Sequence, residues 1–405
     1  MTDPYLPQSE NGDLSGRRAH PIFLYIAVTA AWTIALLGYW AQAQLLDSLM
    51  AEYDLAETAT TALFSFENGG FFATIFCAAW PLARWSRART ALFGGAVVVL
   101  ANVASAYAVN FEMLMALRTL TGIGAGLVSA SGTAAAASSR DPDRTFAVVT
   151  VGWGLVGNLE FVALPYATEP FGATGGYLLM AGMALVLLPT LIWLLPPRES
   201  DAKTEGFFGL VKSAPNRSLA IIAVVALFIF EIGQTGVYTF IEQIGLRSGQ
   251  DAFAVGRTLT GTAYLGLLGG VLASWLGGRF GRKWPIILGL GLNVVAAAGL
   301  CLCEDNYLYI ALNVLWNFAY YFTVPYMMGA LSALDNLGRW VVAGDSLWNG
   351  GTVPGPVIAG ALVEGGGYVP LAGMAVFAGL SCMLMLLGVL SRLEARGGSS
   401  SAVGG

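Results

Sequence analysis

Four charged residues lie deep within apolar stretches of this 405-residue sequence: Glu67, Arg118, Glu160 and Glu231. Inside a membrane a charged side chain costs at least ~2.5–3.5 kcal/mol on insertion scales, so such a residue indicates a functional site by default. Three carboxylates cannot all be paired with one arginine, and a buried carboxyl group without a partner favours its neutral form. Such a group can load and unload a proton. We therefore expect these four residues to couple protons or to contact a solute.

A structural interpretation of the same residues stays open. Arg118 would then form a static ion pair with Glu160 or Glu67 that holds neighbouring helices together. At about 1.5 Å per residue, these three side chains lie about 10–15 Å from the same end of their apolar stretches, so either pair is geometrically feasible. The only histidine, His20, precedes the first apolar stretch, so a proton relay would have to use the acids.

Polar and aromatic side chains in the middle of the apolar stretches predict the wall of a cavity. Asn313 and Asn317 are four residues apart and share one face of a helix. Amide and hydroxyl groups can recognise a solute by hydrogen bonds, while aromatic rings supply apolar contact area. The alternative is an aromatic belt at the membrane surface, which better suits tryptophans at the ends of the stretches. The predicted cavity residues are Trp32, Tyr39, Gln42, Gln234, Tyr238, Asn313, Asn317 and Tyr320.

The composition requires lipid around most of the chain. Hydrophobic residues make up 56% of it and charged residues 11%, whereas soluble domains are about 25% charged. A soluble protein and a large extramembrane domain are therefore excluded. The four cysteines, Cys77, Cys301, Cys303 and Cys382, all lie in apolar stretches, so we expect packing residues rather than disulfides. No group of metal-ligating residues stands out, and we expect no metal.

Twelve apolar stretches are about as long as the roughly 20 residues that a helix needs to span a bilayer. We therefore predict an all-α polytopic membrane protein whose twelve transmembrane helices form two pseudo-symmetric six-helix bundles, 22–195 and 218–391. A cytoplasmic tail (1–21), a cytoplasmic linker (196–217) and a flexible tail (392–405) complete the chain. The stretches lie at 22–46, 57–82, 90–109, 111–137, 145–168 and 174–195 in the first half, and at 218–243, 252–277, 284–303, 306–331, 340–363 and 367–391 in the second.

Lysine and arginine gather in alternate loops. One side collects Arg17 and Arg18 near the N-terminus and Arg392 and Arg396 near the C-terminus, among many others, while the loops of the opposite side hold only Arg247 and Arg257. Basic loops remain in the cytoplasm. We therefore predict that both termini are cytoplasmic and that the protein lies in the cell membrane.

The two halves carry a weak internal repeat. LARWSRAR (82–89) and LGGRFGRK (276–283) come into register at an offset of 194 residues, which is 276 minus 82. Duplicated six-helix bundles are typical of membrane carriers. The segment SWLGGRFGRK (274–283) resembles the cytoplasmic signature GxLaDrxGrk of the major facilitator superfamily, although Gly278 stands where that family has aspartate. The matching residues are Arg279, Gly281, Arg282 and Lys283.

This resemblance covers residues 22–391 and implies the twelve-helix fold of that family. It also implies that the 279–283 segment is a gating loop that steadies the outward-facing state. The alternative is a plain basic loop that satisfies the positive-inside rule. The stretch 111–137 resembles the family's second motif, in which the arginine, here Arg118, is associated with proton coupling.

Glycines in two stretches predict close helix packing. Gly122 and Gly126 have the GxxxG spacing that lets two helices approach, and no strand precedes them to suggest a phosphate loop. Gly351 and Gly355 repeat this spacing in the stretch 340–363, where Pro356 adds a bend.

The function expected from these features is secondary active transport by alternating access, in the form of proton-coupled uptake of a small organic solute, such as an organic or aromatic acid that Arg118 could bind. The stretch GWGLVGNLEFVALP (152–165) lacks the Gly-Pro signature of the family's exporters. Proton-driven efflux of amphipathic or cationic compounds is the alternative, and a non-transporting scaffold is a remote one. An ATP-driven pump is excluded because GxxxxGK[ST] is absent, and we do not expect an enzyme. Protons, the solute and lipid are the expected partners of a monomer, with no cofactor and no nucleic acid.

Overall fold

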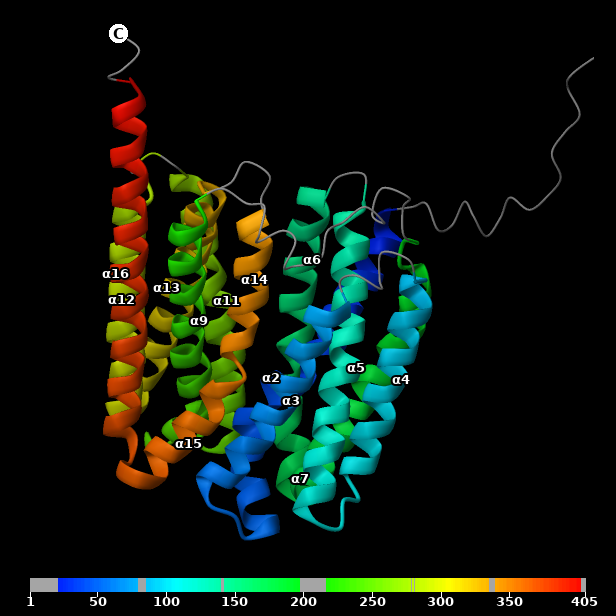
Figure 1. The fold of residues 1–405 in the computed structure, drawn as a ribbon. Coiled ribbons are helices and arrows are strands. Elements are labelled where there is room, and N and C mark those ends of the chain that lie inside the picture. The colour runs from blue at the N-terminus through cyan, green and yellow to red at the C-terminus, as the bar shows by residue number, and fades with distance from the viewer. Residues whose placement is uncertain are drawn as a thin grey trace, which may run out of the picture.

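The computed structural model describes residues 21–78, 85–139, 142–196, 216–277, 279, 281–334 and 339–401. This part of the chain is helical and contains no strand (Figure 1). The predicted tail 1–21 and linker 196–217 lie almost entirely outside the described residues. The helices are α2 (Pro21–Tyr53), α3 (Glu57–Ala78), α4 (Arg87–Ser105), α5 (Phe111–Ala137), α6 (Pro142–Gly157), α7 (Leu159–Leu187), the 3₁₀ helix η2 (Leu188–Trp193), α9 (Arg217–Thr239), α10 (Ile241–Arg247), α11 (Ala252–Leu276), α12 (Lys283–Leu302), α13 (Asn306–Ser332), α14 (Arg339–Gly351), α15 (Pro354–Gly366) and α16 (Tyr368–Ser401).

These elements form the twelve predicted crossings, although two crossings are broken. The fifth is divided at Asn158, between α6 and α7. Helix α7 holds Pro165 and Pro170 and turns back toward the sixth crossing at Gly172, where φ is 57°. The eleventh is interrupted between α14 and α15, where Pro354 begins the second helix at a position that tolerates a missing N–H. Eight of the described helices are long and apolar enough to cross a membrane by length and composition alone.

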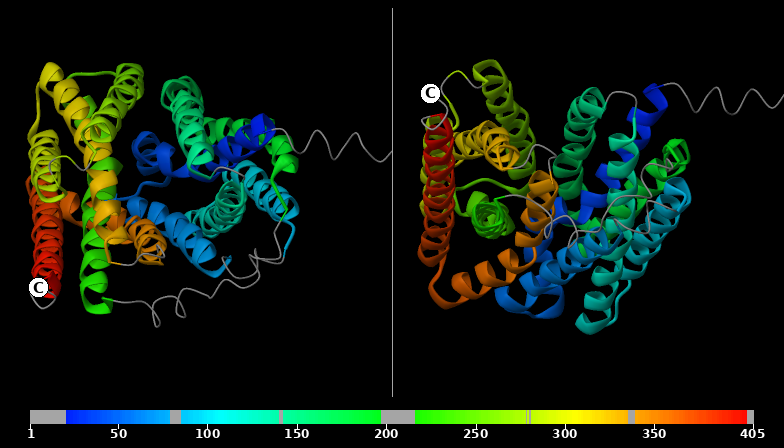
Figure 2. Two further views of the ribbon diagram at one scale, coloured as in Figure 1. Left: turned by 90° about the horizontal axis from the view of Figure 1, so that it is seen from above. Right: turned by 45° about the horizontal axis from the view of Figure 1, so that its top comes forward.

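The crossings form two bundles, α2 to η2 and α9 to α16 (Figure 1). The N-terminal end of α2 and the C-terminal end of α16 lie at the same face of the molecule, which we call the terminal face, and the opposite face is the far face. At the far face α15 crosses beneath its own bundle and packs on α3, while α7 packs on α11. Figure 2 shows the two bundles standing apart when the molecule is seen from the terminal face.

The buried apolar residues, like the helix contacts, join the two bundles near the far face. One buried cluster runs from the first bundle into the far ends of the second, where it includes Val237, Phe240 and Leu371. A separate cluster, which includes Leu219 and Trp340, is confined to the second bundle. The two bundles therefore share a core near the far face.

Glycines permit the closest helix contacts. A Cβ added at Gly122 of α5 would lie 2.0 Å from the carbonyl oxygen of Glu67 in α3, and Gly126 meets the same helix. A Cβ added at Gly351 of α14 would lie 2.6 Å from the carbonyl oxygen of Phe228 in α9. Gly355 and Pro356 are buried in α15, where Gly355 packs on α9.

The end of the chain differs from the prediction. Residues 392–401, predicted as part of a flexible tail, continue α16 as far as Ser401. The segment from Arg392 to Arg396 contains strong helix formers, and Glu394 forms an ion pair with Lys283 of α12. Both features favour extension of the helix beyond the apolar span.

Candidate functional site

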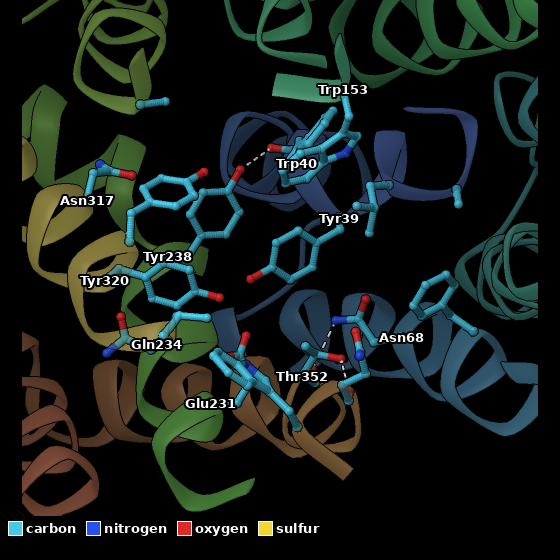
Figure 3. A pocket seen from close by; sticks show the side chains of 18 of the residues that line it. Tyr39, Trp40, Asn68, Trp153, Glu231, Gln234, Tyr238, Asn317, Tyr320 and Thr352 are labelled. Carbon is cyan, nitrogen blue, oxygen red and sulfur yellow. Dashed lines mark hydrogen bonds between the residues drawn. The ribbon is translucent and has the colours of Figure 1, made fainter. Parts of the chain in front are cut away.

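A cavity of about 400 Å³ lies between the two bundles (Figure 3). Its volume falls within the 300–1,000 Å³ range of small-molecule sites. The charged side chains among its described lining residues are two acids, Glu67 and Glu231. The other polar and aromatic lining residues are Tyr39, Trp40, Asn68, Phe71, Trp153, Phe161, Gln234, Tyr238, Asn313, Trp316, Asn317, Tyr320, Tyr321, Trp348, Asn349 and Thr352.

Aromatic contacts close the cavity toward the far face. The rings of Tyr39 in α2 and Tyr238 in α9 stack across the two bundles, with centroids 5.2 Å apart and an interplanar angle of 8°. The Tyr238 hydroxyl donates a 2.8 Å hydrogen bond to the carbonyl of Trp40 (Figure 3). Nearer the far face, Gln243 Nε2 of α10 donates to Asp47 Oδ1 at 3.1 Å. This side of the cavity is therefore held shut by both bundles.

Helices α3 and α15 add further inter-bundle hydrogen bonds. The backbone N–H of Thr58 donates to Glu364 Oε2 at 3.1 Å, and a carboxylate at a helix N-terminus is electrostatically favoured. The backbone N–H of Val357 donates to Ser65 Oγ at 3.2 Å, and Asn68 Nδ2 donates to the carbonyl of Thr352 at 3.0 Å. These bonds follow α3 from the far face to the level of the cavity.

Glu231 lies in the cavity wall and accepts two hydrogen bonds from its own bundle. Trp348 Nε1 of α14 donates to Oε2, and Thr235 Oγ1, one turn along α9, donates to Oε1 at 3.2 Å. Tyr39 from the other bundle lies on the side of the cavity that faces Glu231 (Figure 3). Both carboxylate oxygens are thus fixed by donors, and neither bond comes from a basic side chain.

Arg118 lies outside the cavity wall. It is 1% exposed, its Nη2 donates to Ser105 Oγ at 2.7 Å, and its guanidinium lies over the Tyr177 ring, 4.5 Å from the centroid. Its Nη1 approaches Glu67 Oε1 at 3.6 Å. Of the two static pairs considered from the sequence, the one with Glu67 is therefore present, and Glu67 links this buried cation to the cavity.

Glu160 lies in α7 and is fully buried. Neither of its carboxylate oxygens has a hydrogen-bond partner, and its electrostatic neighbour is Glu67. The adjacent residue, Phe161, lines the cavity. Glu160 is thus an unpaired acid one residue away from the cavity wall.

Six of the eight predicted cavity residues line the cavity: Tyr39, Gln234, Tyr238, Asn313, Asn317 and Tyr320. The structure places the other two elsewhere. Trp32 stacks on Phe146 and its Nε1 donates to Thr133 Oγ1 at 3.1 Å, while Gln42 is 1% exposed inside the first bundle.

Sequence reasoning missed several lining residues, most clearly Trp153, Trp316, Trp348 and Asn68. Trp316 stands beside the predicted Asn317, and Asn68 stands beside the predicted Glu67. The signal that could have identified both residues in the sequence was their position next to a predicted residue in the middle of an apolar stretch. Trp348 precedes the break between α14 and α15, where the sequence predicted only a bend at Pro356.

The predicted gating loop lies at the terminal face between α11 and α12. Gly281 has φ of 65°, which a side chain would strain. The Arg279 guanidinium lies 5.5 Å from the ring centroid of Trp275, and Arg282 approaches Gly329 of α13. Lys283 pairs with Glu394 of α16. The loop is therefore fixed to its own bundle in this arrangement.

Within the described residues, no group of three or more histidine, cysteine, aspartate or glutamate side chains could hold a metal ion. The four cysteines are not joined by disulfides.

Comparison with known proteins gives a family and a fold. The profile of the Major Facilitator Superfamily matches residues 22–334. No curated protein matches the chain significantly. Among solved structures, a variant of the nucleoside transporter NupG is similar with a TM-score of 0.73 and 11% identity, covering 91% of this chain and 99% of that one. A variant of the peptide transporter POT gives 0.71 and 15%, covering 96% and 97%.

A bacterial homologue of the human lysosomal transporter Spinster, in an inward-facing and unoccupied conformation, gives a TM-score of 0.66 and 14% identity, covering 93% of this chain and 95% of that one. At these identities the similarities establish the fold alone.

Proposed function

Because this chain belongs to the major facilitator superfamily, we propose that it is a secondary active transporter that moves a small organic solute by alternating access. In this mechanism two bundles rock around a site near the middle of the membrane and expose it to each side in turn. The observation that carries the proposal is the cavity between the bundles, which side chains of both bundles line. Its far side is closed by bonds such as Thr58–Glu364 and Gln243–Asp47.

The distribution of inter-bundle contacts supports a rocking movement. The shared apolar cluster and the hydrogen bonds between bundles lie from the cavity toward the far face. Opening that face would break these bonds while each bundle keeps its own core. With cytoplasmic termini, the present arrangement is the inward-facing one. The protein would act as a monomer in the cell membrane and without a cofactor.

We further propose that transport is coupled to protons through Glu160 and Glu67. A charged carboxylate without a partner is costly to bury, so Glu160 carries a proton in the present arrangement. Glu67, which lines the cavity and pairs with Arg118, would exchange that proton with water as the bundles move. Arg118 holds Glu67 in place rather than binding the solute.

This position of Arg118 bears on the direction of transport. Uptake of an organic acid would need a cation in the cavity wall, and Arg118 is 1% exposed outside it. The second candidate, exchange of a cationic solute for protons, is favoured because Glu67 and Glu231 are the charged residues among the described part of the cavity lining.

The test is solute-driven proton movement in liposomes that contain the purified full-length protein and a trapped pH-sensitive dye. The solutes are benzoate, phenylacetate, benzyltrimethylammonium and tetraphenylphosphonium, and proton movement is taken as the excess over protein-free liposomes, because undissociated benzoic and phenylacetic acid cross lipid unaided. We expect at least one of them to move protons through the wild type. Glu160→Gln should abolish this movement, whereas Glu242→Gln, which changes a buried acid outside the cavity, should preserve it.

Proton movement that survives Glu160→Gln would contradict the role of Glu160. Absence of movement with every solute would contradict transport and favour the non-transporting scaffold.

A further inference from the structure

We propose that the solute is an organic cation with an aromatic or apolar body, and that its charged group binds between Glu231 and the aromatic rings around it. This inference rests on the proposed transport function and names the class of solute for the same cavity. Four features of the cavity carry it: the sign of its charges, the hydrogen bonding of its wall, the amide pair beside Glu231 and the aromatic rings around Glu231.

The first feature is the sign of charge. Glu67 and Glu231 are the charged side chains among the described lining residues. Glu67 is already paired with Arg118, with Oε1 and Nη1 3.6 Å apart. Glu231 is held by Trp348 and Thr235, which donate hydrogen bonds but carry no charge. A cationic group in the cavity would supply the counter-charge that Glu231 lacks.

The second feature is the hydrogen bonding of the wall, whose amide side chains already donate to acceptors within the protein. Asn68 Nδ2 donates to Thr352, Asn317 Nδ2 donates to the carbonyl of Asn313, and the Tyr238 hydroxyl donates to Trp40. By contrast, Asn313 Oδ1 is a buried acceptor without a partner. The indole N–H groups of Trp153 and Trp316 are also buried without a partner, so it is the amide and phenol groups, rather than the whole wall, that favour a solute that donates hydrogen bonds, as protonated amines do.

The third feature is the amide pair beside Glu231. Gln234 Nε2 donates to Asn293 Oδ1 at 2.8 Å, and Asn293 Nδ2 returns a 3.3 Å bond to Gln234 Oε1. This reciprocal pair holds Gln234 in place. Glu231, three residues earlier in α9, therefore remains the strongest acceptor on this side of the cavity.

The fourth feature is the ring of aromatic side chains around Glu231. Tyr320 meets Trp348 edge-on at 6.0 Å between centroids, and the stacked rings of Tyr39 and Tyr238 lie opposite (Figure 3). Ring faces attract cations within about 6 Å, and tryptophan does so most strongly. Trp316 and Trp153 extend the apolar wall beyond this ring, so they would contact the body of the solute.

Binding to the purified full-length protein in lipid nanodiscs, without any gradient, tests this inference. The probes are 2-phenylethylammonium, which donates hydrogen bonds, and tetraphenylphosphonium, which does not, as cations, and phenylacetate as an acid of similar size to the first. We expect at least one of the cations to bind the wild type and phenylacetate not to bind. Removing one partner of a buried charge pair greatly weakens binding. Glu231→Gln should therefore weaken cation binding at least about 30-fold. Its amide oxygen can still accept the Trp348 bond, so the fold is preserved.

Glu242→Gln is the matched control, since it neutralises a buried acid of α10 that does not line the cavity, and it should leave binding unchanged. Trp348→Phe, which keeps a ring but removes the N–H donor, provides a second variant and should also weaken cation binding. The inference is overturned if phenylacetate binds, if neither cation binds, or if cation binding is the same in the wild type, Glu231→Gln and Trp348→Phe.

The outcomes separate this inference from the proposed function. A cation that binds at Glu231 but moves no protons in liposomes contradicts transport and supports the cation site. Proton movement driven by an acid, with no cation bound, supports transport and overturns the cation site.

Discussion

A single added methyl group at Gly360 should shift the balance between the two arrangements of the bundles. Gly360 lies in α15 against α3 of the other bundle. A Cβ built there would stand 2.0 Å from Thr61 Oγ1, 2.9 Å from the carbonyl oxygen of Glu57 and 3.0 Å from the Cα of Thr58. The hydroxyl of Thr61 can rotate away, but the two backbone atoms can yield only if the helices separate. Gly360→Ala therefore acts on the closed far face and on neither bundle alone.

The magnitude follows from the cost of overpacking, which is about 1–3 kcal/mol. If this cost falls only on the arrangement with the far face closed, the equilibrium shifts about 5–150-fold toward the arrangement with the far face open. Spin labels at Val109→Cys and Tyr307→Cys, two exposed positions at the far ends of different bundles, should report longer distances. Labels at Trp85→Cys and Trp284→Cys, exposed at the terminal face, should report shorter ones.

Gly365→Ala is the matched control for this prediction. Gly365 lies in the same helix, and a Cβ there meets nothing within 4 Å, so the distances should not change. Unchanged distance distributions in Gly360→Ala would refute the reasoning. A loss of thermal stability without any change in either distance would refute it equally.

Three further predictions concern stability, and each is read as a melting temperature of the purified protein. Gly122→Ala brings a Cβ to 2.0 Å from a backbone oxygen of α3 and should lower the free energy of unfolding by about 1–3 kcal/mol. The control Gly182→Ala, whose Cβ meets nothing within 4 Å, should not destabilise the protein. Equal melting temperatures of the two variants would contradict close packing at Gly122. Arg118→Met leaves the Glu67 carboxylate buried without its cation and should lower the free energy of unfolding by about 3–5 kcal/mol. Adding Glu67→Gln should restore part of this stability. A double variant no more stable than Arg118→Met would argue against the ion pair. Burial, followed by the nearby charge of an aspartate, raises the pKa of Glu242, which lies in α10 beyond the end of the α9 span, from 4.5 to about 8. The folded state then keeps this carboxyl neutral where the unfolded chain ionises it, so stability should fall as pH rises between these values; a pH profile that Glu242→Gln leaves unaltered would contradict this.

The sequence was sufficient to predict the twelve crossings and the two bundles, because each crossing needs its own apolar stretch and basic residues recur in alternate loops. It could not predict where crossings break. The fifth crossing breaks at Asn158, between α6 and α7, and the eleventh restarts at Pro354, two residues before the predicted bend at Pro356. Isolated glycines and prolines are also tolerated inside membrane helices, so they do not mark a break by themselves. The helical continuation of α16 was missed because charged residues at a span end suit both a tail and an extended helix.

The direction in which a side chain points was harder still. Arg118 and Gly122 are four residues apart in α5, yet Gly122 lines the cavity and Arg118 turns toward Ser105 and Tyr177. Trp32 and Tyr39 are both aromatic residues of α2, and only Tyr39 lines the cavity. These choices depend on which neighbouring helix packs on each face, which a single sequence does not encode locally.

The most direct test of the central claim is reversible locking of the far face. Ser65→Cys and Val357→Cys would bridge α3 and α15, where the Val357 N–H lies 3.2 Å from Ser65 Oγ. In liposomes, with the native cysteines replaced, oxidation of this pair should stop the proton movement driven by the solute that is most active with the wild type, and reduction should restore it. Proton movement at an unchanged rate while the pair is oxidised would contradict alternating access between the two bundles.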